Sequence, residues 1–144
     1  MIEQDTVKLL RECDAGIDMG IASIGDVLEF VSDGEFKDTL SQCKDEHEVL
    51  KNEIEGLLDS YGDDGKAPNP IAKGMSWMKI NVKLTLDESD KTIADLITDG
   101  CNMGIKTLNK YLNQYEAADE KSKDITKRLI KLEETLNEDI RKFL

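Results

Sequence analysis

The sequence predicts an all-α protein, a single-domain antiparallel four-helix bundle over residues 1–144, with a long crossover between its second and third long helices. Three observations support this prediction. Apolar residues recur every three or four positions in four long segments, as expected for amphipathic helices. No stretch shows strand alternation of useful length. Part of the chain is also repeated, and a helix pair that occurs twice with a long link between the copies builds one class of four-helix bundle.

The repeat is short but in register. Residues 18–24 (Asp-Met-Gly-Ile-Ala-Ser-Ile) return 84 positions later as residues 102–108 (Asn-Met-Gly-Ile-Lys-Thr-Leu). Four glycines occupy symmetric places in the two copies: Gly16, Gly20, Gly100 and Gly104. A glycine inside a helix costs about 1 kcal/mol relative to alanine, so these glycines need a packing reason. We expect the two helices that carry them to approach each other closely.

The first two long helices are expected over residues 5–31 and 34–61. The apolar stripe of the first consists of Leu10, Cys13, Ile17, Ile21, Ile24, Leu28 and Val31. Residues 32–35 (Ser-Asp-Gly-Glu) break the helix and fit a capping box, in which Ser32 or Asp33 caps the next helix and Glu35 reaches back. The second stripe follows an unbroken 4-3-4-3 spacing: Phe36, Leu40, Cys43, His47, Leu50, Ile54, Leu57 and Tyr61. The one histidine of the chain therefore lies in the middle of the predicted core.

Residues 62–70 are polar, rich in glycine and proline, and too long for a tight turn. We expect this segment to run from one end of the bundle to the other, so that the next long helix is parallel to its predecessor. An extra short helix is expected at about 70–85, with Asn69 as its cap and Pro70 in its first turn. Its apolar residues, Trp77 among them, would cover the end of the bundle or form a partner surface.

The third and fourth long helices are expected over residues 90–116 and 122–143. The third presents Ile93, Ile97, Gly104, Leu108, Tyr111 and Tyr115 to the core. The fourth presents Ile125, Leu129, Leu132, Leu136, Ile140 and Phe143.

Composition narrows the classes of function. Asp and Glu number 31 against 19 Lys and Arg, giving a net charge of −12 with no basic block. This balance argues against nucleic acid and anionic membranes as partners. No apolar run reaches the roughly 18 residues of a membrane span, and the first residues lack the features of a signal peptide. The three cysteines, Cys13, Cys43 and Cys101, have no metal-binding spacing, so we interpret them as reduced core residues of a cytoplasmic protein.

Three stretches resemble a bacterial family of ferritin-like four-helix bundles described as a domain of unknown function. They are residues 13–18 (Cys-Asp-Ala-Gly-Ile-Asp), 74–78 (Gly-Met-Ser-Trp-Met) and 100–103 (Gly-Cys-Asn-Met). The resemblance implies the ferritin-like helix order. It also implies that any metal centre would lie in the core of the bundle.

The di-iron ligand pattern is degraded in this chain. Such bundles take one carboxylate from each of two helices and a Glu-x-x-His pair from each of the other two. Here Lys44 stands three residues before His47, the fourth long helix has no histidine, and the repeat partner of Asp18 is Asn102. The remaining candidates for metal ligands are His47, Asp14, Asp18 and Glu133. An intact two-metal centre is therefore not expected, and iron or manganese would need a remodelled site.

His47 keeps three interpretations: a core histidine satisfied by a carboxylate or carbonyl, a ligand in a mononuclear or remodelled site, or a polar relic of a lost site. The leading hypothesis for function is a non-enzymatic bundle that acts through self-association or a protein partner, as a structural or stress-associated protein. No catalytic residue is identified. The alternative is an iron- or manganese-dependent oxidase or peroxide-handling protein centred on His47. A third hypothesis is an interaction module that presents an acidic face or the Trp77 segment.

Overall fold

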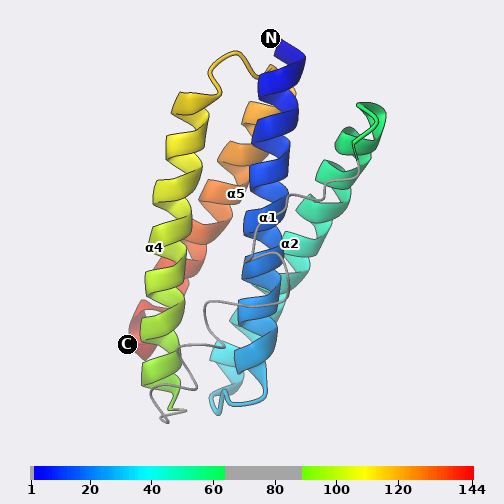
Figure 1. The fold of residues 1–144 in the computed structure, drawn as a ribbon. Coiled ribbons are helices and arrows are strands. Elements are labelled where there is room, and N and C mark those ends of the chain that lie inside the picture. The colour runs from blue at the N-terminus through cyan, green and yellow to red at the C-terminus, as the bar shows by residue number, and fades with distance from the viewer. Residues whose placement is uncertain (1, 64–88) are drawn as a thin grey trace.

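A computed structural model describes residues 2–63 and 89–144, which form four long helices (Figure 1). These are α1 (Ile2–Leu28), α2 (Gly34–Ser60), α4 (Asp90–Gln114) and α5 (Glu120–Asp139), followed by the 3₁₀ helix η2 (Arg141–Phe143). No strand occurs in this part of the chain. The prediction of an all-α protein with four long helices is therefore confirmed. The crossover and the short helix expected at about 70–85, with Trp77, lie outside the described residues.

Helix ends differ from the prediction where local hydrogen bonds decide them. α1 ends at Leu28 instead of residue 31, because the amides of Phe30 and Val31 donate to carbonyls only three residues back. The cap of α2 is Asp33, whose carboxylate accepts from the Phe36 amide at 3.0 Å. Glu35 forms an ion pair with Lys142, so the second half of the predicted capping box is wrong.

α5 begins two residues earlier than predicted and ends four residues earlier. Its start follows from Asp119, whose carboxylate accepts from the Ser122 amide at 2.8 Å and so caps the helix. At the other end the chain tightens into η2, where Phe143 stacks on Phe36 with ring centroids 4.5 Å apart. α4 ends at Gln114, two residues before the predicted end.

The apolar stripes are largely as predicted, with shifts of one residue at some turns. Leu58 and Val27 are buried, whereas the predicted Leu57 and Leu28 are only partly buried. Tyr111 and Tyr115 are also partly exposed and stack on each other with centroids 5.8 Å apart. A straight helix has 3.6 residues per turn, so a strict seven-residue pattern drifts off the buried face along 27 residues.

The buried apolar residues form two clusters, one toward each end of the bundle. On every long helix the change from one cluster to the other occurs around one position. Ile17 and Ile24 flank it on α1, and Cys43 and Leu50 flank it on α2. On α4 the flanking residues are Cys101 and Leu108, and on α5 they are Leu129 and Leu136. Between these pairs lie Gly20, His47, Gly104 and Glu133, so two glycines and two polar side chains separate the clusters in the middle of the bundle.

Hydrogen bonds join the two helix pairs reciprocally. The carboxylate of Asp90, at the start of α4, accepts from the amides of Ser32 and Asp33 at 2.8 and 2.9 Å. At the other end, Asp5 of α1 accepts from the Ala117 amide at 3.1 Å, and Thr6 Oγ1 accepts from the Asp119 amide at 2.8 Å. Each helix pair therefore supplies hydrogen-bond acceptors for the amides in the turn of the other pair. α1 begins at the end of the bundle where α4 ends (Figure 1).

Substitution Asp90→Ala tests this link. It leaves two loop amides without their acceptor, so we expect a loss of about 1–2 kcal/mol in the free energy of unfolding, measured by urea denaturation. Asp95→Ala is the matched control, because Asp95 is an exposed residue of the same helix. Equal stability of the two variants would contradict the proposed role of Asp90.

Candidate functional site

A cavity of about 240 Å³ lies in the middle layer of the bundle, between α1 and α4. Its walls carry small residues, and His47 of α2 and Glu133 of α5 reach it from the other two helices. The main lining residues are Ala15, Gly16, Gly20, Ser23, His47, Gly100, Gly104, Thr107 and Glu133. The remaining polar lining residues, Glu12 and Tyr111, are partly exposed.

Two glycines make room for the two polar side chains. A Cβ atom at Gly20 would lie 3.1 Å from both Nε2 and Cδ2 of His47. A Cβ atom at Gly104 would lie 2.6 and 2.7 Å from the carboxyl oxygens of Glu133. No such neighbour lies within 4 Å of a Cβ at Gly16. The expectation of close helix contact at these three glycines is therefore wrong, because their space is used by side chains of α2 and α5 or left as cavity.

His47 is almost fully buried, with 2% of its surface exposed. Its Nδ1 lies 2.8 Å from the carbonyl oxygen of Cys43, and since a carbonyl only accepts, Nδ1 carries a proton and donates. Burial lowers the pKa of His47, and the bond to Cys43 only partly opposes this shift. The neutral ring therefore presents the lone pair of Nε2, an acceptor, at the cavity.

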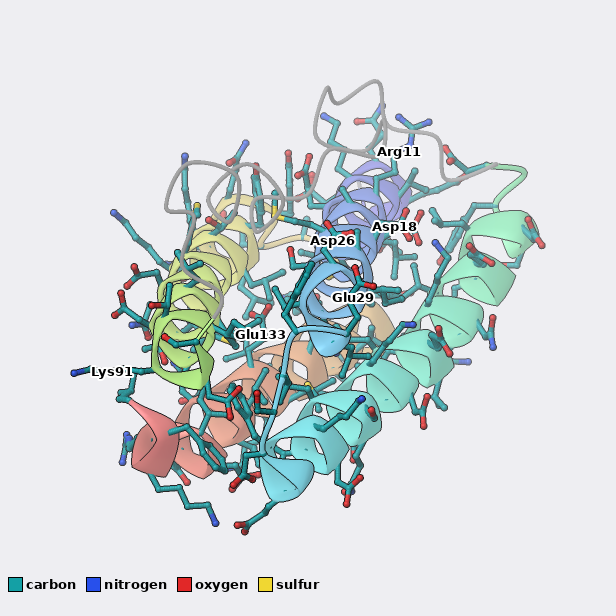
Figure 2. The ribbon with its side chains drawn as sticks, turned by 90° about the horizontal axis from the view of Figure 1, so that it is seen from below. Arg11, Asp18, Asp26, Glu29, Lys91 and Glu133 are labelled. Carbon is teal, nitrogen blue, oxygen red and sulfur yellow. The ribbon has the colours of Figure 1, made fainter. Side chains whose placement is uncertain are left out.

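Glu133 is partly exposed as a residue, but its Oε2 is buried and has no hydrogen-bond partner. Figure 2 shows Glu133 among the four helices, whereas Lys91 extends outward from α4. Burial raises the pKa of the Glu133 carboxyl to about 8. At neutral pH most of this carboxyl is protonated and offers one O–H donor beside an acceptor oxygen.

His47 and Glu133 occupy equivalent places in the two helix pairs. Asp119 caps α5 as Asp33 caps α2, and it follows Asp33 by 86 positions. Glu133 follows His47 by the same 86 positions. Each polar side chain therefore lies fourteen residues after its cap and faces a repeat-related glycine. Aligning the caps of the second and fourth helices is the signal in the sequence that pairs Glu133 with His47.

The other two predicted ligands lie elsewhere. Neither Asp14 nor Asp18 lines the cavity. Asp18 forms an ion pair with Lys51 of α2. Asp14 is buried, and its pKa is raised to about 6 by burial first and by the nearby Asp18 charge second. The structure therefore brings together two of the four candidates, His47 and Glu133.

These residues do not fit a two-metal centre. The positions of α1 and α4 that face His47 and Glu133 are Gly20 and Gly104, which have no ligand atoms, whereas a di-iron bundle supplies carboxylates from every helix. Within residues 2–63 and 89–144 no group of three or more His, Cys, Asp and Glu side chains is placed to hold a metal ion.

The three cysteines are free and buried, as predicted for core residues. Thr126 donates to the Ser122 carbonyl at 2.8 Å, so Cys13 donates its thiol proton to Thr126 Oγ1 at 3.1 Å. Burial raises the pKa of Cys13 and Cys43 to about 12 and raises that of Cys101 as well. Un-ionised thiols are poor nucleophiles and poor metal ligands, although Cys101 lines the cavity.

The repeat-related methionines, Met19 and Met103, also line the cavity. Neither residue belongs to the apolar stripes that the sequence predicts. Met103 is 44% exposed, so it lies where the cavity wall meets the surface. Methionine side chains are flexible and adapt to irregular space, which suits a wall beside an opening.

Comparison of the chain with protein-family models, with curated proteins and with solved structures finds no match. Among the described helices, none combines the length and the apolar character that a membrane span requires.

The substitution Glu133→Gln tests the protonation of the buried carboxyl. In the folded protein Glu133 keeps its proton up to about pH 8, whereas the unfolded chain releases it near 4.5. Its contribution to stability is therefore present below about pH 4.5 and is lost as pH rises toward 8, at up to about 1.4 kcal/mol per pH unit. The difference in unfolding free energy between Glu133→Gln and the parent should shift in favour of the variant across this interval.

Urea denaturation at pH 5, 6, 7 and 8 measures this difference. The titrations of His47 and Asp14 cancel in it, because the parent and the variant share both residues. Glu134→Gln, at the exposed neighbouring residue, is the control. A difference that stays constant with pH would show that Glu133 is ionised in the folded protein.

Proposed function

We propose that this protein is a non-enzymatic, ferritin-like bundle that binds a small, largely apolar organic molecule in the cavity between α1 and α4. The ferritin-like order is supported by the positions of the helix ends. Tyr61, just after α2, donates to Asp119 at 3.2 Å, whereas α4 starts beside Ser32 at the opposite end. A ferritin-like crossover joins helix ends that are placed in this way.

The observation that carries the proposal is the cavity itself. Its volume of about 240 Å³ exceeds the roughly 150 Å³ of an engineered apolar cavity that takes up benzene. Gly16, Gly20 and Gly104 each cost helix stability, and Oε2 of Glu133 is buried there without a hydrogen-bond partner beside the almost fully buried His47. A mainly apolar pocket with a few convergent polar groups is the common form of a small-molecule site.

The alternative of an iron- or manganese-dependent oxidase is less well supported. His47 and Glu133 do line one cavity, but they supply two metal ligands, whereas a two-metal oxidase needs about six. Metal analysis by mass spectrometry of protein purified without chelator separates the two proposals. Near-stoichiometric iron or manganese that is lost in His47→Ala would favour the oxidase. Self-association or a protein partner stays a prediction from sequence.

The substitution Gly16→Leu tests the cavity proposal with toluene as the probe. Gly16 lines the cavity and a Cβ there meets nothing within 4 Å, so the leucine side chain has room to occupy it. We expect the free energy of unfolding of the ligand-free variant, measured by urea denaturation, to rise by about 1–2 kcal/mol. We expect its affinity for toluene to fall at least tenfold. Binding is measured by the thermal shift of the melting temperature against toluene concentration.

Gly56→Leu is the matched control, since Gly56 is exposed on α2 and also has nothing within 4 Å of its Cβ. It should gain only helix propensity and keep toluene binding. Absence of toluene binding to the parent protein, or equal binding to both variants, would overturn the proposed function.

A further inference from the structure

The polar groups of the cavity point to the chemistry of its ligand, and this inference rests on the proposed function. We infer that the ligand is a neutral molecule in which a single hydroxyl group is attached to an apolar ring or chain, and that this hydroxyl is read by His47 and Glu133.

Nε2 of His47 can pair only with a hydrogen-bond donor on the ligand. Its Nδ1 proton is committed to the Cys43 carbonyl at 2.8 Å, which leaves Nε2 as a lone pair packed against Gly20. The ring is 2% exposed, so solvent competes poorly for this lone pair. A ligand that lacks a donor would leave a buried acceptor unpaired, at a cost in affinity.

The surroundings of Glu133 favour an uncharged group on the ligand. Its Oε2 is buried without a hydrogen bond, and among the described residues that line the cavity none is a lysine or an arginine. A carboxylate ligand would place a second acid beside it. An ammonium ligand would need Glu133 to ionise in an environment that favours its neutral form, because burial disfavours charge. A hydroxyl instead pairs with a carboxylic acid as donor or acceptor.

The rest of the wall excludes a larger polar group. Apart from these two side chains, the hydroxyls of Ser23 and Thr107 and the partly exposed Glu12 and Tyr111, the described lining consists of small and apolar residues such as Gly20, Ile24, Gly104 and Leu108. A larger polar group on the ligand would lose its water against this apolar part of the wall without gaining a partner there. A single hydroxyl on an otherwise apolar body therefore fits the inventory of donors and acceptors.

The test compares four probes that share one methyl-substituted ring: toluene, p-cresol, p-methylbenzylamine and p-toluate. Binding to the full chain is measured at pH 7 by calorimetry and by thermal shift. We expect p-cresol to bind at least tenfold more tightly than toluene, and the amine and the acid to bind more weakly than p-cresol. Equal affinity for p-cresol and toluene would overturn the inference and leave the apolar cavity proposal standing.

Tightest binding of the amine or the acid would also overturn the inference, since the site would then prefer a charged ligand. If none of the four probes binds, the proposed function itself fails. These outcomes distinguish failure of the ligand class from failure of the cavity proposal.

Variants assign the preference to the two residues. Glu133→Gln keeps a neutral donor and acceptor, so it should retain most of the preference for p-cresol over toluene, whereas Glu133→Leu and His47→Phe should reduce it to less than threefold. Glu134→Leu, at the exposed neighbouring position, is the control and should leave the preference unchanged. The ratio of two affinities in one variant is insensitive to a general loss of stability. Loss of the preference in Glu133→Gln would show that a carboxylate is required and would overturn the inference.

Discussion

The structure depends on the absence of a Cβ atom at two positions. Gly20 and Gly104 allow His47 and Glu133 to lie directly against the backbones of α1 and α4. Any larger residue at Gly104 would displace the Glu133 carboxyl, since a Cβ would come within 2.7 Å of both oxygens. The two glycines therefore fix the depth of the polar groups and leave the space that becomes the cavity.

This middle layer divides the apolar core, and the stabilisation that is lost there has to come from other parts of the bundle. Two apolar clusters lie on either side of it, and the reciprocal hydrogen bonds of Asp90, Asp5 and Thr6 hold the helix pairs together at the ends. The ends of the bundle are thus tied by packing and turn hydrogen bonds, while the centre keeps a buried carboxyl oxygen, Oε2 of Glu133, without a hydrogen-bond partner.

The sequence predicts the helices and the burial of His47, because apolar spacing of three and four residues is a strong local signal. It does not predict the role of the glycines, since a glycine gives the same pattern whether a helix, a side chain or a cavity lies opposite. The sequence does not exclude Asp18 as a ligand, because its pairing with Lys51 depends on how α1 packs against α2. The apolar pattern alone does not pair Glu133 with His47, whereas alignment of the caps Asp33 and Asp119 does.

The proposed binding site requires that the two polar groups in its mainly apolar cavity, His47 and Glu133, are both neutral. Nuclear magnetic resonance of the full chain measures this directly, by following the side-chain carboxyl carbon of Glu133 and the ring nitrogens of His47 against pH. We predict that Glu133 titrates near pH 8 and that His47 carries its proton on Nδ1 at neutral pH. A Glu133 carboxyl that titrates near 4.5, or a doubly protonated His47 ring at pH 7, would contradict this prediction.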